Sequence, residues 1–342
     1  MAFNKYKKNG LTGLVNLGNT CFMNSTLQAL SHTYELHDIL QSDWKFKKNI
    51  TNEDELLTNE YNELINLMWK DNGKISPNRF LHFLYKVAIS KDKEIFTGYS
   101  QNDMPEFLLF LFDCIHKSLC REVSVNIKGS VQHSVDKIAK ICYEYKKKTY
   151  EKEYSEIYEN FFGLTVSQVT SLKNKTYSIR PEYYNILDLP INEQCKTLYD
   201  CFDFFVTPEY LNKENNNQYY YEKEDKYIDA KKRLIFWDFP NILIISLKRY
   251  ENWNNKKNQM VHFPVNNLDL SKYVCGYKAS TYVYDLYSII NHSGHATGGH
   301  YTTYVRNADN KWFHFNDDDV TLIDGNKLLS PLAYVLFYRK KT

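Results

Sequence analysis

The sequence has 342 residues, of which 43% are hydrophobic and 25% charged, so it is long enough for one large domain or two smaller ones with a sizeable core. Its net charge of +2 does not indicate nucleic acid or an anionic membrane as a partner, and no apolar run reaches the roughly 20 residues of a membrane-spanning helix. Seven scattered cysteines and a polar, basic N-terminus argue against a secreted disulfide scaffold, so we expect an intracellular protein, cytoplasmic, nuclear or both.

Residues 13–30 change character at Cys21. Before this cysteine, glycine and asparagine favour a loop with positive φ. After it, an apolar face without Gly or Pro predicts a helix over residues 20–40, capped by Asn19 or Thr20. Cys21 would then lie at a helix N-terminus, where free N–H groups and the helix dipole favour a thiolate and can hold an oxyanion. A small buried cysteine at the start of a helix is the alternative.

Further helices precede a series of strands. The helix expected at residues 103–119 opens with Asp103, Pro105 and Glu106, and its two acids either form a capping box or serve a binding site. The other expected helices are 52–69, 77–87, part of 131–160, and 198–206. Expected strands are 163–169, 177–179, 186–191, 241–248, 282–290, 301–306, 311–315 and 334–339, with an exposed tip at 212–226. Helices first and strands later indicate an α+β fold.

A candidate base for Cys21 lies among three histidines, His292, His295 and His300. An imidazole can accept the thiol proton and later protonate a leaving amine. His300 follows two glycines, which let a substrate come close, and begins a strand, which is a rigid support. We expect His292 and His295 in a surface loop. A zinc site built from the three histidines is the alternative, but no further Cys or His has ligand spacing around them.

A third group must orient His300. A hairpin from Tyr301 to Phe315 would return Asn316 and Asp317 beside it. Adjacent residues at the end of a strand point in opposite directions, so one of the two should face His300 and the other should face away. Either an amide oxygen or a carboxylate can accept the imidazole N–H.

These stretches resemble the two catalytic boxes of the ubiquitin-specific proteases, which are papain-like deubiquitinases. Residues 13–30 closely resemble the cysteine box, and residues 298–317 resemble the histidine box. Residues 101–107 look like the intervening acidic motif of the family, with Asn102 and Pro105 as departures. Residues 243–249 resemble a family strand that ends in Leu-Lys-Arg, and the resemblance runs from Gly13 to Tyr338 in the family's order.

The resemblance implies a papain-like cysteine protease fold of the α+β class, described as a right hand with a helical thumb, a β-rich palm and β fingers. It implies a flexible lead-in of residues 1–10 and a single catalytic domain over 11–342. The thumb is expected at about 11–122, the fingers at about 162–233, and the palm at about 234–342 plus connecting segments. Cys21 would lie between thumb and palm, facing His300.

The same resemblance implies a thiol-dependent deubiquitinase that hydrolyses the peptide or isopeptide bond after the C-terminal glycine of ubiquitin. Cys21 would be the nucleophile and His300 the general base and then acid. Asn16 matches the position that stabilises the oxyanion. The third catalytic position of the family corresponds to Asn316, so we expect Asn316 to orient His300, with Asp317 as the alternative.

The tail of ubiquitin is expected to meet a second set of residues. Asp103 and Glu106 would pair with its arginines, because a carboxylate–guanidinium fork is strong and directional. The other residues expected beside the tail are Gln101, Gly299 and Tyr301. Loops 251–259 and 291–299 match the family's blocking loops and are expected to order around the tail.

Many family members hold a structural zinc at the fingers with two Cys-x-x-Cys pairs. The matching stretches here, 169–174 and 219–224, contain no cysteine, and Cys195 and Cys201 have the wrong spacing. We therefore expect no metal and no cofactor, with tyrosine packing in place of zinc. The expected partners are ubiquitin or ubiquitinated proteins, without nucleic acid or membrane, and we expect a monomer. Two alternatives are an inactive ubiquitin-binding module and a protease for another modifier or for ordinary peptides.

Overall fold

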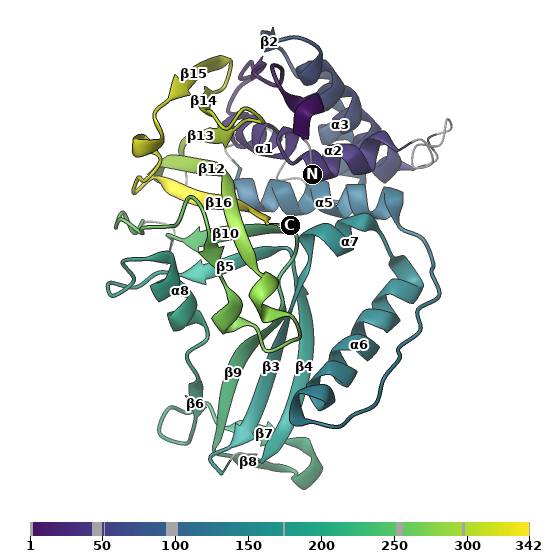
Figure 1. Ribbon diagram of the computed structural model, residues 1–342, viewed down its shortest axis with the longest axis vertical. Helices are drawn as coiled ribbons and strands as arrows, with labels where there is room; N and C mark the ends of the chain where they lie inside the picture. Colours follow the sequence, from purple (N-terminus) through teal and green to yellow (C-terminus); the bar gives the residue numbers. More distant parts are fainter. Residues whose placement is uncertain are drawn as a thin grey trace.

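The computed structural model describes residues 3–42, 50, 52–93, 102–173, 175–250, 256–295 and 298–341. The helical end of the molecule, in the upper half of Figure 1, is formed by α1 (Cys21–Ser31), α2 (Tyr34–Gln41), α3 (Glu53–Lys70), α4 (Asn78–Ser90) and α5 (Met104–Leu119). A short parallel pair, β1 (Gly13–Leu14) and β2 (Lys74–Ile75), joins the segment before α1 to the segment before α4.

Helix α5 lies inside the helical end because most of its residues are apolar. Phe107, Leu108 and Leu111 have no exposed surface, and the helix packs against α1, α3 and α7 (Glu156–Phe161). A helix that is apolar around most of its circumference is stable only when it is enclosed. The buried helix predicted at 103–119 is therefore confirmed.

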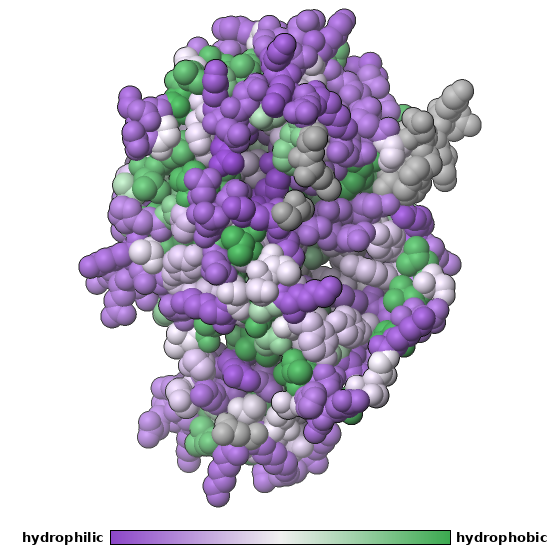
Figure 2. Space-filling model, viewed as in Figure 1, coloured by the Kyte–Doolittle hydropathy of each residue, from purple (hydrophilic) through white to green (hydrophobic). Residues whose placement is uncertain are grey.

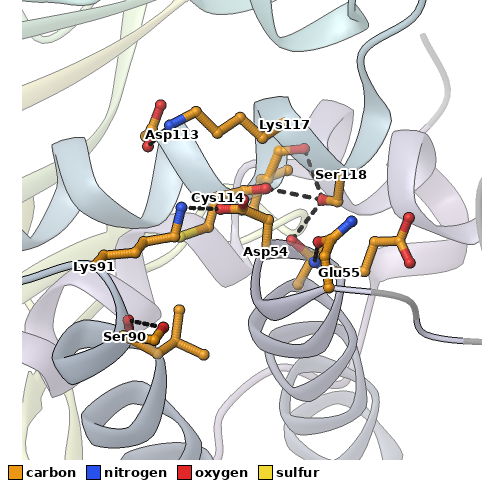
Figure 3. A network of polar contacts seen from close by, with 12 residues as sticks. Asp54, Glu55, Ser90, Lys91, Asp113, Cys114, Lys117 and Ser118 are labelled. Atoms are coloured by element: carbon orange, nitrogen blue, oxygen red, sulfur yellow. Dashed lines mark hydrogen bonds and ion pairs between the residues drawn. The ribbon is translucent and has the colours of Figure 1, made fainter.

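Polar contacts join α3 to α5 and to the end of α4 (Figure 3). Asp54 pairs with Lys91 at 2.7 Å, and the Thr58 and Ser118 hydroxyls hydrogen-bond at 2.7 Å. Burial, followed by the charge of Asp54, raises the pKa of the Cys114 thiol, so this cysteine stays protonated inside the network. These contacts fix the three helices relative to one another.

The single helix expected over residues 20–40 is instead divided into α1 and α2 at His32 and Thr33. The Thr33 amide bonds the Leu30 carbonyl at 3.0 Å, and the Thr33 hydroxyl bonds the Ala29 carbonyl at 3.0 Å. That hydroxyl also lies 2.7 Å from the Tyr287 hydroxyl in the main sheet. A threonine that competes for helix carbonyls favours a break, and this tertiary contact fixes it in place.

The main sheet has eight strands within the described residues, in the order β15-β14-β13-β12-β16-β10-β5, with β11 paired to β12. Only β10 and β5 are parallel among these pairs. The strands are β5 (Ile186–Pro190), β10 (Ile242–Lys248), β11 (Leu268–Asp269), β12 (Val283–His295), β13 (Gly298–Arg306), β14 (Trp312–Asn316), β15 (Asp319–Ile323) and β16 (Ala333–Lys340).

Both faces of the main sheet are covered. Along β10, Ile242 and Ile244 join the core beneath the helices, whereas Leu243 and Ile245 join a second core that includes residues of α8 (Leu198–Phe205). Successive side chains of a strand point to opposite faces, so an uninterrupted apolar run is what a doubly covered strand requires.

A second sheet, in the order β4-β3-β9-β6, extends away from the helical end toward the bottom of Figure 1. Its strands are β3 (Gly163–Ser171), β4 (Thr176–Tyr184), β6 (Glu209–Leu211) and β9 (Ala230–Asp238), and α6 (Ser134–Glu153) contacts β4. The hairpin of β7 (Tyr219–Tyr221) and β8 (Lys226–Ile228) lies at its far end (Figure 1). The Tyr177 ring lies 4.8 Å from the Tyr221 ring and 6.3 Å from the Tyr219 ring, so aromatic packing joins the hairpin to the sheet.

The division into thumb, fingers and palm at the expected bounds stays a prediction. Strand β5 lies inside the range expected for the fingers, yet it pairs with β10 in the main sheet. Within the expected lead-in, residues 3–6 form a 3-10 turn in which the Tyr6 ring stacks on Tyr34 at 4.2 Å.

The surface seen in Figure 2 is largely hydrophilic, and hydrophobic residues form separate patches on it. Across the described ranges, none of the helices combines the length and the apolar character needed to cross a bilayer.

Candidate active site

The loop that leads into α1 is fixed by Asn16. Its side-chain oxygen accepts hydrogen bonds from the Gly18 amide at 3.0 Å and the Thr20 amide at 3.1 Å. Gly18 and Asn19 have φ of 99° and 56°, the left-handed region that the sequence pattern predicts here. Thr20 precedes the helix, but its side chain makes no capping bond. The loop is therefore held by an asparagine side chain rather than by a helix cap.

Cys21 is the first residue of α1 and only 4% of its surface is exposed. Burial is the largest influence on its thiol and raises the pKa, and the charge of Asp317 acts in the same direction. Backbone hydrogen bonds from Tyr301, Phe22 and Cys21 itself lower the pKa, but by less. The amide groups at the helix N-terminus thus favour a thiolate, as expected, but desolvation outweighs them, so the net effect is a raised pKa of the thiol.

His300 lies near the start of β13, the strand that packs against α1. The Thr303 hydroxyl, farther along β13, bonds the Ser25 carbonyl of α1 at 3.0 Å, which holds helix and strand together. His300 Nε2 lies 2.6 Å from Asn316 Oδ1. When the amide oxygen accepts the Nε2 proton, the neutral ring keeps its lone pair on Nδ1, where it can act as a base.

Asn316 reaches His300 through the predicted hairpin. Strand β13 pairs antiparallel with β14, with Thr303 opposite Phe315, and Asn316 is the last residue of β14. Asp317 follows in a turn with φ of 52°. The chain therefore reverses between the two candidate orienting residues, and their side chains separate.

The Asp317 carboxylate is bound by residues of the loop before Cys21 and of α1. It accepts hydrogen bonds from Asn24 Nδ2 at 2.8 Å and from Asn16 Nδ2 at 3.0 Å. The Asp317 carbonyl accepts the Leu14 amide at 3.0 Å. At Gly13 an added Cβ would lie 2.4 Å from the Asp318 carbonyl oxygen, so only glycine fits this approach. Asp317 thus joins the loop before Cys21 to the hairpin of β13 and β14, which carries His300.

Asp103 precedes α5 without capping it, since its side chain makes no capping bond. Its carboxylate accepts hydrogen bonds from the Tyr301 hydroxyl at 3.0 Å and the Tyr334 hydroxyl at 3.2 Å. Desolvation of the carboxyl group raises its pKa, and the two hydroxyls lower it by less, although the residue as a whole keeps solvent contact. Glu106 is exposed in the first turn of α5, and Gln101 lies outside the described residues. The capping-box interpretation was therefore wrong for Asp103.

His292 contradicts the expected surface loop. It lies in β12, it is 4% exposed, and burial is the first cause that lowers its pKa to about 4. Its Nδ1 atom lies 2.7 Å from the Tyr250 hydroxyl. His295, at the end of the same strand, is exposed. Residues 291–295 and 298–300 are paired strands, whereas residues 296–297 and 251–255 of the expected blocking loops lie outside the described part of the chain.

Sequence reasoning missed three contributors to this region, namely His292, Tyr250 and Tyr334. One signal could have found His292: the run from Tyr282 contains no Gly or Pro before Gly294, which favours a strand through residue 292. The contacts of Tyr250 and Tyr334 join distant segments and leave no local pattern.

No group of three or more His, Cys, Asp or Glu side chains in the described ranges is arranged to hold a metal ion. The expected absence of zinc at the fingers stays a prediction. Cys195 and Cys201, the two cysteines nearest that region in sequence, are buried in the core beside the main sheet.

Comparisons with known proteins agree with the family resemblance of the cysteine and histidine motifs. A family model described as ubiquitin carboxyl-terminal hydrolase matches residues 12–338. Ubiquitin carboxyl-terminal hydrolase 2 of Homo sapiens is 33% identical over 350 residues, which cover 98% of this chain and 56% of the relative. Ubiquitin carboxyl-terminal hydrolase Usp2 of Drosophila melanogaster is 32% identical over 345 residues, which cover 98% and 35%. The chain thus spans about a third to just over half the length of these relatives.

Solved structures share the fold. A chain of the SAGA Ubp8/Sgf11/Sus1/Sgf73 DUB module bound to ubiquitin aldehyde superposes with a TM-score of 0.74 at 25% identity, covering 98% of this chain and 71% of that chain. This likeness confirms the predicted α+β, papain-like fold. Because the family model matches nearly the whole sequence and both relatives exceed 30% identity over almost all of it, the chain belongs to the ubiquitin carboxyl-terminal hydrolase family, of the ubiquitin-specific protease type.

Proposed function

We propose that the chain is a thiol-dependent deubiquitinase that hydrolyses the peptide or isopeptide bond after the C-terminal glycine of ubiquitin. One observation carries the proposal: His300, bonded to Asn316 at 2.6 Å, lies on the strand packed against the helix that begins at Cys21. The names of the relatives and the ubiquitin aldehyde bound to the Ubp8 module support ubiquitin as the substrate.

In the proposed reaction, His300 Nδ1 accepts the Cys21 proton as Sγ attacks the carbonyl carbon. Because burial raises the pKa of the thiol, a base is needed to form the thiolate. The oxyanion is stabilised by the Asn16 amide and the Cys21 N–H. Protonated His300 then donates its proton to the leaving amine, which leaves a thioester. Water, deprotonated by His300, hydrolyses the thioester and restores Cys21.

Asn16 and Asn316 have different duties in this scheme. One Asn16 N–H bonds Asp317, which leaves its second N–H for an oxyanion. Asn316 fixes the tautomer and orientation of the His300 ring. The ubiquitin tail would bind along Gly299 and Tyr301, with its arginines at Asp103 and Glu106 and with Gln101 nearby.

We also propose an intracellular location, in cytoplasm, nucleus or both, and a monomeric enzyme that binds neither nucleic acid nor membrane. All seven cysteines are free thiols, which fits a reducing compartment.

The test uses a ubiquitin vinyl sulfone probe beside matching probes for related modifiers. We expect the ubiquitin probe alone to label the protein, at Cys21, and expect fluorogenic ubiquitin to be hydrolysed. Cys21→Ala should abolish labelling and turnover yet keep ubiquitin binding, because the small substitution leaves the binding surface intact. Equal labelling by another modifier, or turnover by the variant, would contradict the proposal.

A further inference from the structure

Two tyrosines bond Asp103, the acid expected to meet the substrate tail, and a third tyrosine packs against one of them. We call Asp103, Tyr301, Tyr334 and Tyr250 the tyrosine clamp. Tyr301 and Tyr334 donate their hydroxyl protons to the Asp103 carboxylate at 3.0 and 3.2 Å. The rings of Tyr250 and Tyr334 lie 6.1 Å apart, as do those of Tyr301 and Tyr334. The orientation of the carboxylate therefore depends on where these rings lie.

His292 lies against three members of the clamp. Its ring centroid is 4.4 Å from that of Tyr301 and 5.8 Å from that of Tyr334, and Nδ1 lies 2.7 Å from the Tyr250 hydroxyl. The Lys256 ammonium donates to the His292 carbonyl at 2.6 Å. The buried imidazole thus supports Tyr301 and joins it to the segment after β10.

The other edge of His292 fits against the strand that carries His300. His292 pairs with Tyr301, and Ser293 pairs with His300. An added Cβ on Gly299 would lie 2.3 Å from His292 Nε2, so the glycine gives the imidazole its space. This observation gives Gly299 a second role, beside the approach of a substrate.

The imidazole stays neutral at physiological pH. Burial first, and then the charges of Lys256 and His300, lower its pKa to about 4. The titratable groups that face it are Tyr250, Lys256, Tyr301, Tyr334 and His300, with Asp103 beyond the two tyrosine hydroxyls. A neutral ring can accept the Tyr250 hydroxyl proton at Nδ1 and can pack against Tyr301 without a desolvated charge.

We propose that His292 is a positioning residue for the subsite that binds the substrate tail. By supporting the Tyr301 ring and holding Tyr250, it sets the geometry in which Asp103 meets a guanidinium group. The inference rests on the proposed function, and it separates two histidines: His300 moves protons, whereas His292 governs recognition. Its loss should therefore weaken binding of the tail more than it slows bond cleavage.

The first experiment compares four variants in steady-state hydrolysis of fluorogenic ubiquitin. We expect His292→Ala to raise KM at least about tenfold while kcat falls less than about threefold. His292→Asn keeps an acceptor for Tyr250 and His292→Phe keeps a ring against Tyr301, so each should recover part of the loss. Tyr250→Phe, which removes a single hydroxyl, should raise KM about threefold and serves if His292→Ala does not fold.

Alkylation of Cys21 by iodoacetamide is the control for the catalytic pair. The reagent does not use the tail subsite, so its rate should change less than about twofold in every variant. A fall in alkylation equal to the fall in kcat/KM, or a loss of kcat at unchanged KM, would overturn the proposal. An unreactive wild type would instead contradict the proposed function.

A double-mutant cycle with Asp103→Asn tests the route from His292 to the substrate. If His292 acts through the clamp, adding His292→Ala to Asp103→Asn should change kcat/KM less than about twofold further. Multiplicative effects of the two substitutions would show that His292 acts elsewhere and would overturn the assignment.

Discussion

Asn316 and Asp317 are neighbours in sequence, but their side chains bind different residues of the candidate site. Asn316 lies at the end of β14 and bonds His300, whereas Asp317, at φ of 52°, bonds Asn16 in the loop before α1 and Asn24 in α1. One residue thus holds the base, and the next holds the loop that carries the nucleophile.

Substitution should separate these two duties. We expect Asn316→Ala to lower kcat at least about tenfold, or about 1.4 kcal/mol, because the imidazole loses its acceptor. Asp317→Ala should cost less in kcat but should lower the free energy of unfolding by about 1–3 kcal/mol, since the buried Asn24 amide and the exposed Asn16 amide lose a charged partner. Steady-state kinetics and urea unfolding of both variants check this. If kcat fell more in Asp317→Ala than in Asn316→Ala, Asp317 would be the residue that orients His300.

The sequence pattern predicted which residues would meet at the candidate site better than it predicted the residues that surround them. The pairing of β13 with β14, which brings Asn316 to His300, follows from two strands and a turn. The burial that raises the pKa of Cys21 depends on the packing of distant segments, so local helix geometry gave the wrong direction. His292 was misplaced for the same reason, because its covering residues come from other parts of the chain.

At the scale of elements, aromatic packing joins the hairpin of β7 and β8 to the second sheet. Tyr177 of β4 packs against Tyr219 and Tyr221 of β7, which belong to residues 219–224, a stretch without cysteine. Tyrosine rings bury a large area at little entropic cost, so they can join a hairpin to a sheet.

Two measurements test this arrangement. We expect elemental analysis to find no stoichiometric zinc and expect chelation to leave the melting temperature unchanged, since no cysteine pair lies at the tip. Tyr177→Ala should lower the melting temperature and increase proteolysis within residues 219–228. About one tightly bound zinc per chain, or destabilisation by a chelator, would contradict the prediction.

The type and bounds of several elements were predictable from local patterns, whereas two ends that depend on tertiary contacts were not. The helix α3 and the strands β3, β10, β14 and β16 lie within a few residues of their expected bounds. The break between α1 and α2 depends on the Thr33–Tyr287 contact, and the extension of β12 to His295 depends on pairing with β13. Both depend on tertiary contacts, which local propensities do not predict.

At the scale of the whole molecule, buried neutral histidines make the fold sensitive to acid. His32 has no exposed surface, and burial lowers its pKa from 6.5 to about 4. Between these values the unfolded chain binds a proton that the folded protein does not. His32 therefore leaves the free energy of unfolding unchanged above pH 6.5. As the pH falls from 6.5 toward 4, that free energy decreases by roughly 3 kcal/mol because of His32 alone.

Urea unfolding at pH 7.5 and pH 5 measures this sensitivity. We expect the wild type to lose stability at pH 5, and expect His32→Asn, which keeps a donor for the Gln28 carbonyl, to lose less over the same interval. An identical loss in both proteins would assign the acid sensitivity to other groups.

The contact between the loop before Cys21 and the hairpin of β13 and β14 also determines when the candidate site can form during protein synthesis. Asn16 and Asp317 are 301 positions apart, so at about 5–20 residues per second the ribosome adds the second roughly 15–60 s after the first. During that interval Cys21 exists without His300, Asn316 or the carboxylate that holds its loop. If the proposed function holds, a nascent chain would therefore carry the thiol without its base, and cleavage of ubiquitin conjugates would begin only after residues 300–317 have emerged and folded.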